Sequence, residues 1–117
     1  MHLVYGLLMM NFRSMTILTD IDIIAIQSFT SACSRGKTSL KMTHKEVCNG
    51  IEEEFKEFRD ATDEPSEHIP PFTQKQEELA DIILAAATEL LKLCSKSENL
   101  PSEVIKAKIK FNWKREK

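Results

Sequence analysis

Two acidic runs contain the residues best suited to chemistry. Residues 53–57 read Glu-Glu-Phe-Lys-Glu, and residues 78–81 read Glu-Leu-Ala-Asp. Each run holds two carboxylates three positions apart, a spacing that puts side chains on nearly the same face of an α-helix. These carboxylates are Glu54 and Glu57, then Glu78 and Asp81. Two such helices side by side would bring the four groups together, and they would then need a cation between them. Hard oxygen ligands suit Mg²⁺ or Mn²⁺, and Mg²⁺ commonly works with phosphates.

The rest of the chain predicts the helices that position these runs. Apolar periodicity and capping residues predict helices over residues 21–35, 44–61, 73–95 and 101–113. Gly36 suits the position just after the first helix, and Thr43 with Glu46 forms a capping box for the second. Pro101 suits the first turn of the last helix. Because no stretch predicts a strand, we expect an all-α bundle of about four helices.

The second helix is expected to bury a stripe formed by Val47, Ile51, Phe55 and Phe58. On a helical wheel Glu54 lies at the edge of this stripe, while Glu53 points almost opposite it. A carboxylate that borders a core must be paired or bound to metal. The placement of Glu54 and the second acidic pair at the same spacing make a metal site an equal alternative to a solvated acidic face.

The third predicted helix is apolar over more than half of its circumference. Such a helix contacts more than one neighbour, and a chain of 117 residues buries only a modest fraction of its surface. Glu78 and Asp81 occupy the narrow polar arc that remains. We therefore expect the chain to be at least dimeric.

Length and composition indicate one domain, which we place at residues 19–117. Residues 1–18 are interpreted as a variable or poorly ordered extension, because their apolar stretch is too short to span a membrane and lacks the features of a secretory signal. The net charge of −2 gives no general attraction to nucleic acid or to membranes. The three cysteines, Cys33, Cys48 and Cys94, show no close pairing and predict reduced thiols in a cytoplasmic protein.

Two basic features have competing interpretations. Residues 35–39 read Arg-Gly-Lys-Thr-Ser, like the end of a phosphate-binding P-loop. That motif needs a preceding strand and a glycine where Ser31 stands, so we interpret the run as a helix end and a basic loop. In the last helix three polar residues share a face, either as an ordinary basic helix end or as a phosphate clamp. They are Lys108, Asn112 and Arg115.

In this order, the two acidic runs resemble the EExxE…ExxD signature of the MazG-like all-α nucleotide pyrophosphohydrolases. Residues 108–115 are similar to the closing helix of that family, and the resemblance covers about residues 20–115. Two departures are visible. Phe55 and Lys56 replace small residues inside the first motif, and the proline-rich loop 62–73 has no counterpart.

The resemblance implies a helical bundle that assembles as a homodimer or as a dimer of dimers (a homotetramer). It also implies Mg²⁺-dependent hydrolysis of a nucleoside or deoxynucleoside triphosphate to the monophosphate and pyrophosphate, in house-cleaning or nucleotide-pool control. It implies four metal ligands, Glu54, Glu57, Glu78 and Asp81, and a Glu53 that orients or activates water. Lys108, Asn112 and Arg115 would contact phosphates. Two alternatives stay open. One is a non-catalytic helical dimer that binds or regulates, and the other is a pyrophosphohydrolase for a metabolite such as phosphoribosyl-ATP.

Overall fold

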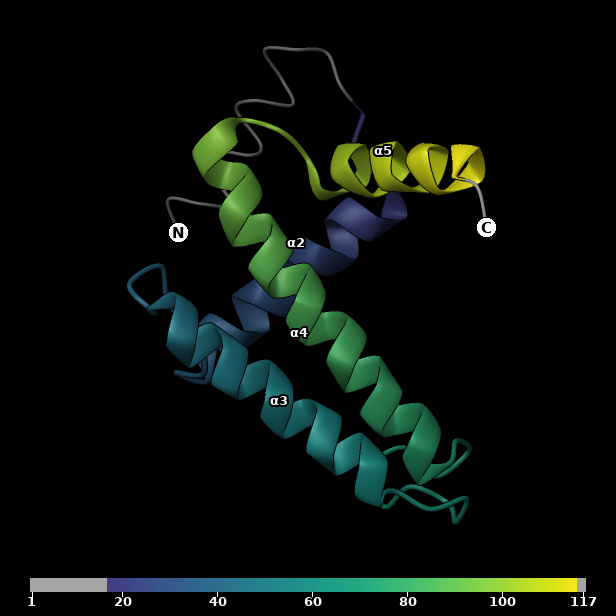
Figure 1. Ribbon diagram of the computed structural model, residues 1–117. Coiled ribbons are helices and arrows are strands. Elements are labelled where there is room, and N and C mark those ends of the chain that lie inside the picture. Colours follow the sequence, from purple (N-terminus) through teal and green to yellow (C-terminus); the bar gives the residue numbers. More distant parts are fainter. Residues whose placement is uncertain (1–16, 116–117) are drawn as a thin grey trace.

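The computed structural model describes residues 17–115, which form four α-helices and no strand (Figure 1). The helices are α2 (Asp20–Ser34), α3 (His44–Asp60), α4 (Gln74–Ser97) and α5 (Pro101–Lys114). The all-α class is therefore confirmed, and the predicted boundaries lie close to the observed ones.

The helix ends follow from local sequence. The Thr43 hydroxyl accepts a hydrogen bond from the Glu46 amide (3.1 Å), and the Glu46 carboxylate accepts one from the Thr43 amide (2.9 Å). This reciprocal pair is the predicted capping box. At the end of α2, Gly36 has a φ of +70°, a left-handed conformation that glycine adopts without a steric penalty. Capping of this kind fixes where each loop begins.

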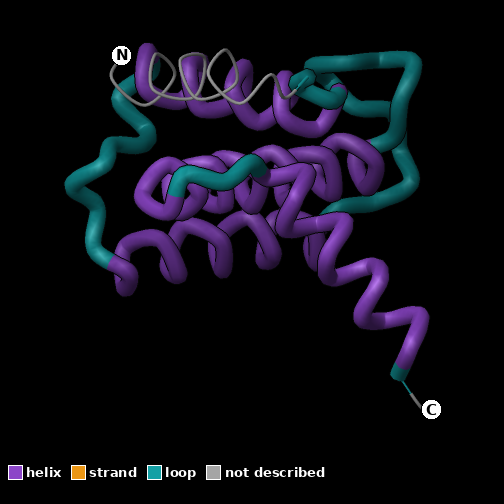
Figure 2. The backbone as a smooth tube through the Cα atoms, turned by 90° about the horizontal axis from the view of Figure 1, so that it is seen from above, coloured by secondary structure: helices purple, strands orange, loops and turns teal. Residues whose placement is uncertain are grey.

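Helix α4 is the centre of the arrangement and contacts α2, α3 and α5. In Figure 1, α3 runs alongside α4 in the opposite direction, and α2 crosses behind α4. In Figure 2 the last helix leaves the stack of the other helices and ends away from it. The prediction that the third helix has several neighbours is thus confirmed.

The hydrophobic core lies where α2, α4 and the start of α5 meet. Its members are Ala25, Phe29, Ala87, Leu91 and Leu100. Next to this core, the buried carboxylate of Asp22 accepts hydrogen bonds from the Ser102 amide (2.8 Å) and hydroxyl (2.7 Å). The amide and hydroxyl of Thr19 donate to it as well, each at 3.0 Å. Asp22 therefore joins the beginning of α2 to the beginning of α5.

The expected buried stripe of α3 is wrong in one respect. Phe55 is 52% exposed, and α3 contains no fully buried residue. Val47, Ile51 and Phe58 are half-buried. The reason is that α3 packs chiefly against α4, so a single chain covers only part of its apolar face.

An apolar stripe on α4 also remains uncovered in the single chain. Leu79, Ile83, Ala86 and Leu93 are exposed, and Leu90 is half-buried. These positions follow one another at steps of four, three, four and three residues, which is the spacing of a helix–helix seam.

The prediction for the N-terminal extension mostly falls on residues 1–16, which lie outside the described residues. Leu18, at its end, is half-buried and packs against the core. Within residues 17–115, no helix combines the length and apolar character required to cross a membrane.

Candidate metal centre

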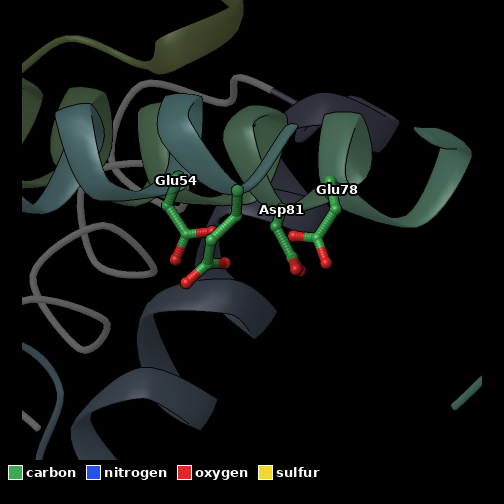
Figure 3. A group of neighbouring side chains, drawn as sticks. Glu54, Glu78 and Asp81 are labelled. Atoms are coloured by element: carbon green, nitrogen blue, oxygen red, sulfur yellow. The ribbon is translucent and has the colours of Figure 1, made fainter. Parts of the chain in front are cut away.

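Antiparallel packing of α3 on α4 brings the two acidic runs together. Glu54 and Glu57 lie on α3, whereas Glu78 and Asp81 lie in the first turns of α4. One carboxylate oxygen from each of the four residues lies within 4.8 Å of the others. Figure 3 shows the carboxylates of Glu54, Glu78 and Asp81 pointing to the same side of the two helices. The convergence expected from the sequence is therefore present in the structure.

Two oxygens of this cluster have no hydrogen-bond partner among residues 17–115. Oε2 of Glu54 and Oε2 of Glu78 are buried, and neither accepts a hydrogen bond. A buried carboxylate oxygen without a donor is costly unless a cation compensates it. The two orphaned oxygens therefore point to a positively charged ligand at this position.

The electrostatics of the cluster agree with this interpretation. Burial raises the pKa of Glu54, and the negative charges of Glu57, Asp81 and Glu78 raise it further. Burial and the charge of Asp81 likewise raise the pKa of Glu78. The pKa of Asp81 is raised by burial and by Glu77 and Glu57, although Arg35 and His68 oppose the shift. Each raised pKa reports that the ionised form is disfavoured without a neutralising partner.

The donor set fits a hard divalent cation. All four groups offer carboxylate oxygens, which suit Mg²⁺ or Mn²⁺ better than the softer metals that bind Cys and His. Their oxygens lie within 4.8 Å of one another, so the four groups face one common space.

The loop between α3 and α4 supports the start of α4 in a way that the sequence did not suggest. The Ser66 hydroxyl donates to Oε1 of Glu77 (2.5 Å), and Nδ1 of His68 lies 2.8 Å from Oε2 of the same carboxylate. Ser66 is 2% exposed, and its hydroxyl oxygen also accepts hydrogen bonds from the backbone amides of His68 and Ile69. These bonds hold the proline-rich loop beside Glu78. The signal for them, a serine and a histidine inside residues 62–73, is too common to identify in advance.

A cavity of about 930 Å³ adjoins the carboxylates and lies among α2, α3 and α4. Glu54 and Asp81 belong to its wall, as does Glu53. Ile24, Ile51 and Leu84 give it an apolar part. Its position next to the cluster suits an organic ligand that carries a metal-binding group. The assignment of Glu53 to water stays a prediction.

The predicted phosphate clamp lies elsewhere in the single chain. Nζ of Lys108 is 4.6 Å from the centre of the Phe111 ring, and the Arg115 guanidinium lies 6.0 Å from it. Arg115 also donates to Asn112 at 3.4 Å. However, α5 packs on α2 and α4, and at 1.5 Å per residue Asp81 lies about 24 Å along α4 from its end. The structure brings the three clamp residues near one another, but not to the carboxylates of their own chain.

Any inference about the function of this protein must rest on the residues of its site. No family model, no curated protein and no solved structure matches this chain. The resemblance to MazG-like enzymes therefore stays a prediction from the two acidic motifs.

Proposed function

We propose that this protein is a Mg²⁺-dependent, MazG-like nucleotide pyrophosphohydrolase of the cytoplasm, hydrolysing a nucleoside or deoxynucleoside triphosphate to the monophosphate and pyrophosphate. The observation that carries the proposal is the carboxylate cluster with its two orphaned oxygens. An acidic patch kept in solvent would not bury unpartnered oxygens beside three other carboxylates. A cavity directly adjoining that cluster offers room for the rest of a nucleotide.

The chemistry follows from charge. Mg²⁺ would be held by Glu54, Glu57, Glu78 and Asp81. When bound, it would neutralise the negative charge of the phosphate oxygens. Water attacks the α-phosphorus and releases a proton to solvent, while the bond from that phosphorus to the oxygen that bridges it to the β-phosphorus breaks. Pyrophosphate leaves with the bonding electrons. Phosphoryl transfer depends mainly on positioning and on charge stabilisation. Glu53 borders the same cavity, and in this proposal it accepts a hydrogen bond from the attacking water and orients it.

The proposed enzyme is a homodimer or homotetramer. The apolar stripe of α4 remains exposed in the part of the chain that the structure describes, where Leu79, Ile83 and Leu93 are 45%, 54% and 63% exposed. A second copy would cover this stripe with the same spacing. In such an assembly Lys108, Asn112 and Arg115 can act as a clamp only where α5 of one protomer lies over the carboxylates of the other.

A panel of canonical and modified nucleoside triphosphates, with phosphoribosyl-ATP included, tests the function. Release of pyrophosphate together with the monophosphate, dependent on Mg²⁺, is the expected result for at least one compound. The distance between the clamp residues and the carboxylates within one chain favours one competitor, the non-catalytic helical dimer. That competitor predicts thermal stabilisation by Mg²⁺ and nucleotide without turnover of any compound in the panel.

A further inference from the structure

The basic loop that follows α2 borders the same cavity as the carboxylates. Arg35 and Lys37 belong to the cavity wall, and so do Glu54 and Asp81. The loop therefore places two cationic side chains and two of the metal-binding candidates around one space. These basic residues belong to the run that is similar to the end of a P-loop, although here they follow a helix.

The backbone around these two residues is fixed by the way α2 ends. The Lys37 amide donates to the Ala32 carbonyl (2.8 Å), and the Gly36 amide donates to the Cys33 carbonyl (3.0 Å). This pair of bonds, with Gly36 in the left-handed conformation, is a Schellman motif. Arg35 and Lys37 stand on either side of that glycine, so the motif sets where both side chains leave the backbone.

A buried lysine ties the next residue of the loop to α4. Lys92 is 7% exposed, and its Nζ donates to the Thr38 hydroxyl at 3.0 Å. The same Nζ pairs with the Glu89 carboxylate at 2.8 Å. The charge of Lys92 is thus already used within the protein. Its contacts hold the loop against the helix that carries Glu78 and Asp81.

In contrast, the charges of Arg35 and Lys37 are available for a ligand. Within residues 17–115, neither side chain forms an ion pair. The guanidinium of Arg35 is close enough to Asp81 to oppose the rise in the pKa of that carboxyl. A ligand that fits between them therefore needs negative charge on the side that faces Arg35 and Lys37. On the side that faces the carboxylates it needs a bound cation. A polyphosphate bound to a divalent metal has this charge pattern.

We propose that Arg35 and Lys37 form the phosphate-binding side of the site and hold the phosphates of the metal-bound substrate from across the cavity. This inference rests on the proposed function and names residues for it that the acidic motifs do not contain. Arg35 provides a planar fork that can bind two phosphate oxygens, whereas Lys37 provides a point charge. The substrate class is accordingly a polyphosphate ester rather than a monophosphate.

Calorimetric titration with inorganic triphosphate in saturating Mg²⁺ tests the inference, and titration with Mn²⁺ alone tests the carboxylates separately. Arg35→Gln and Lys37→Gln should each weaken triphosphate binding about ten-fold or more. Their Mn²⁺ affinity should be undiminished, because neither substitution removes a carboxylate. Lys41→Gln is the matched control, since Lys41 is exposed in the same loop and does not border the cavity.

The two titrations separate the possible failures. If the Arg35 and Lys37 variants bind triphosphate as the wild type does, the inference is overturned, whereas the carboxylate site stands on its Mn²⁺ binding. An equal loss of binding in the Lys41 variant would also overturn it, because the effect would then be one of general charge. If the wild type binds no Mn²⁺, the proposed function fails, and the inference that depends on it fails too.

Discussion

Among the described residues, the buried carboxylate of Asp22 and the half-buried carboxylates of the cluster have different surroundings. Asp22 is 1% exposed and meets four donors from Thr19 and Ser102. Burial alone would raise its pKa, but the hydrogen bonds from Ser102 and Thr19 outweigh burial, and the pKa is lowered. In the cluster the same chemical group is surrounded by other acceptors, and the pKa values of Glu54, Glu78 and Asp81 are raised.

The contrast separates a carboxylate whose partners lie within the fold from carboxylates that we propose bind a metal ion. At Asp22 the protein supplies every partner, so the charge is stable within the fold. At the cluster, residues 17–115 supply no hydrogen-bond partner for the buried oxygens of Glu54 and Glu78, and in our proposal a cation is that partner. Substitutions in the two regions should consequently affect different properties: stability at Asp22, and metal binding with turnover at the cluster.

The largest effect is expected from Asp81→Asn. This substitution keeps the shape of the side chain and removes one negative charge from the metal site. Turnover should fall by more than about 100-fold, since even residues that only orient metal ligands are worth about 10–100-fold. Mg²⁺ affinity should fall with it, while the free energy of unfolding without metal should not decrease. Glu52→Gln, at an exposed residue of α3 just before the first acidic run, should behave as the wild type. Equal activity of the two variants would refute the site.

Asp22→Asn should have the opposite profile. An amide in place of this carboxylate turns one acceptor into a donor that faces the Ser102 and Thr19 donors. We expect a loss of about 2–3 kcal/mol in the free energy of unfolding, measured by urea denaturation. Mn²⁺ binding at the cluster should persist in the folded protein. Asp20→Asn, exposed in the same first turn, should lose less than about 1 kcal/mol. A loss of Mn²⁺ affinity in folded Asp22→Asn would show that the two regions are not independent.

These two regions also show how far sequence reasoning reaches. Glu54 and Glu57, like Glu78 and Asp81, lie three residues apart, so their shared faces follow from helix geometry alone. The convergence of the two pairs needed one further assumption, that the two helices pack side by side. The partnership of Asp22 with Ser102 spans a sequence separation of 80 residues, and no local pattern encodes it. Seryl and aspartyl side chains at two helix starts are ordinary caps, so nothing marks them as partners.

The wrong prediction of a buried Phe55 and the untested prediction of a phosphate clamp on α5 have the same origin. Phe55 has the spacing of a buried residue, yet it is 52% exposed in the single chain, where the Arg59 guanidinium lies 5.7 Å from the centre of its ring. The face shared by Lys108, Asn112 and Arg115 was predictable, but the direction in which α5 leaves the bundle was not. That direction depends on a short break, residues 98–100, and on how the start of α5 packs against α2. Periodicity describes one helix at a time and cannot place it relative to the others.

A smaller effect is expected from Glu54→Gln in the absence of metal. The substitution removes one of four mutually repelling charges, so the metal-free protein should become more stable by about 1 kcal/mol. The same variant should lose Mg²⁺-dependent stabilisation and activity. Thermal melts with and without Mg²⁺ measure both consequences. A variant less stable than the wild type in both conditions would show that Glu54 contributes to packing rather than to a cation site.

The smallest effects, and the sharpest comparison, lie in the pH dependence of these two variants. Asp22 has a lowered pKa in the folded state, so its stabilisation is present above the unfolded-state value of about 4 and is lost as pH falls through the folded-state value. The penalty of Asp22→Asn should therefore shrink below about pH 4. Glu54 has a raised pKa, so its protonated form favours folding at low pH, and that advantage disappears as pH rises through the folded-state value. The gain from Glu54→Gln should consequently be near zero at low pH and reach its full size toward neutrality. Urea denaturation without metal at several pH values measures both curves, and parallel curves would contradict the difference between the two regions.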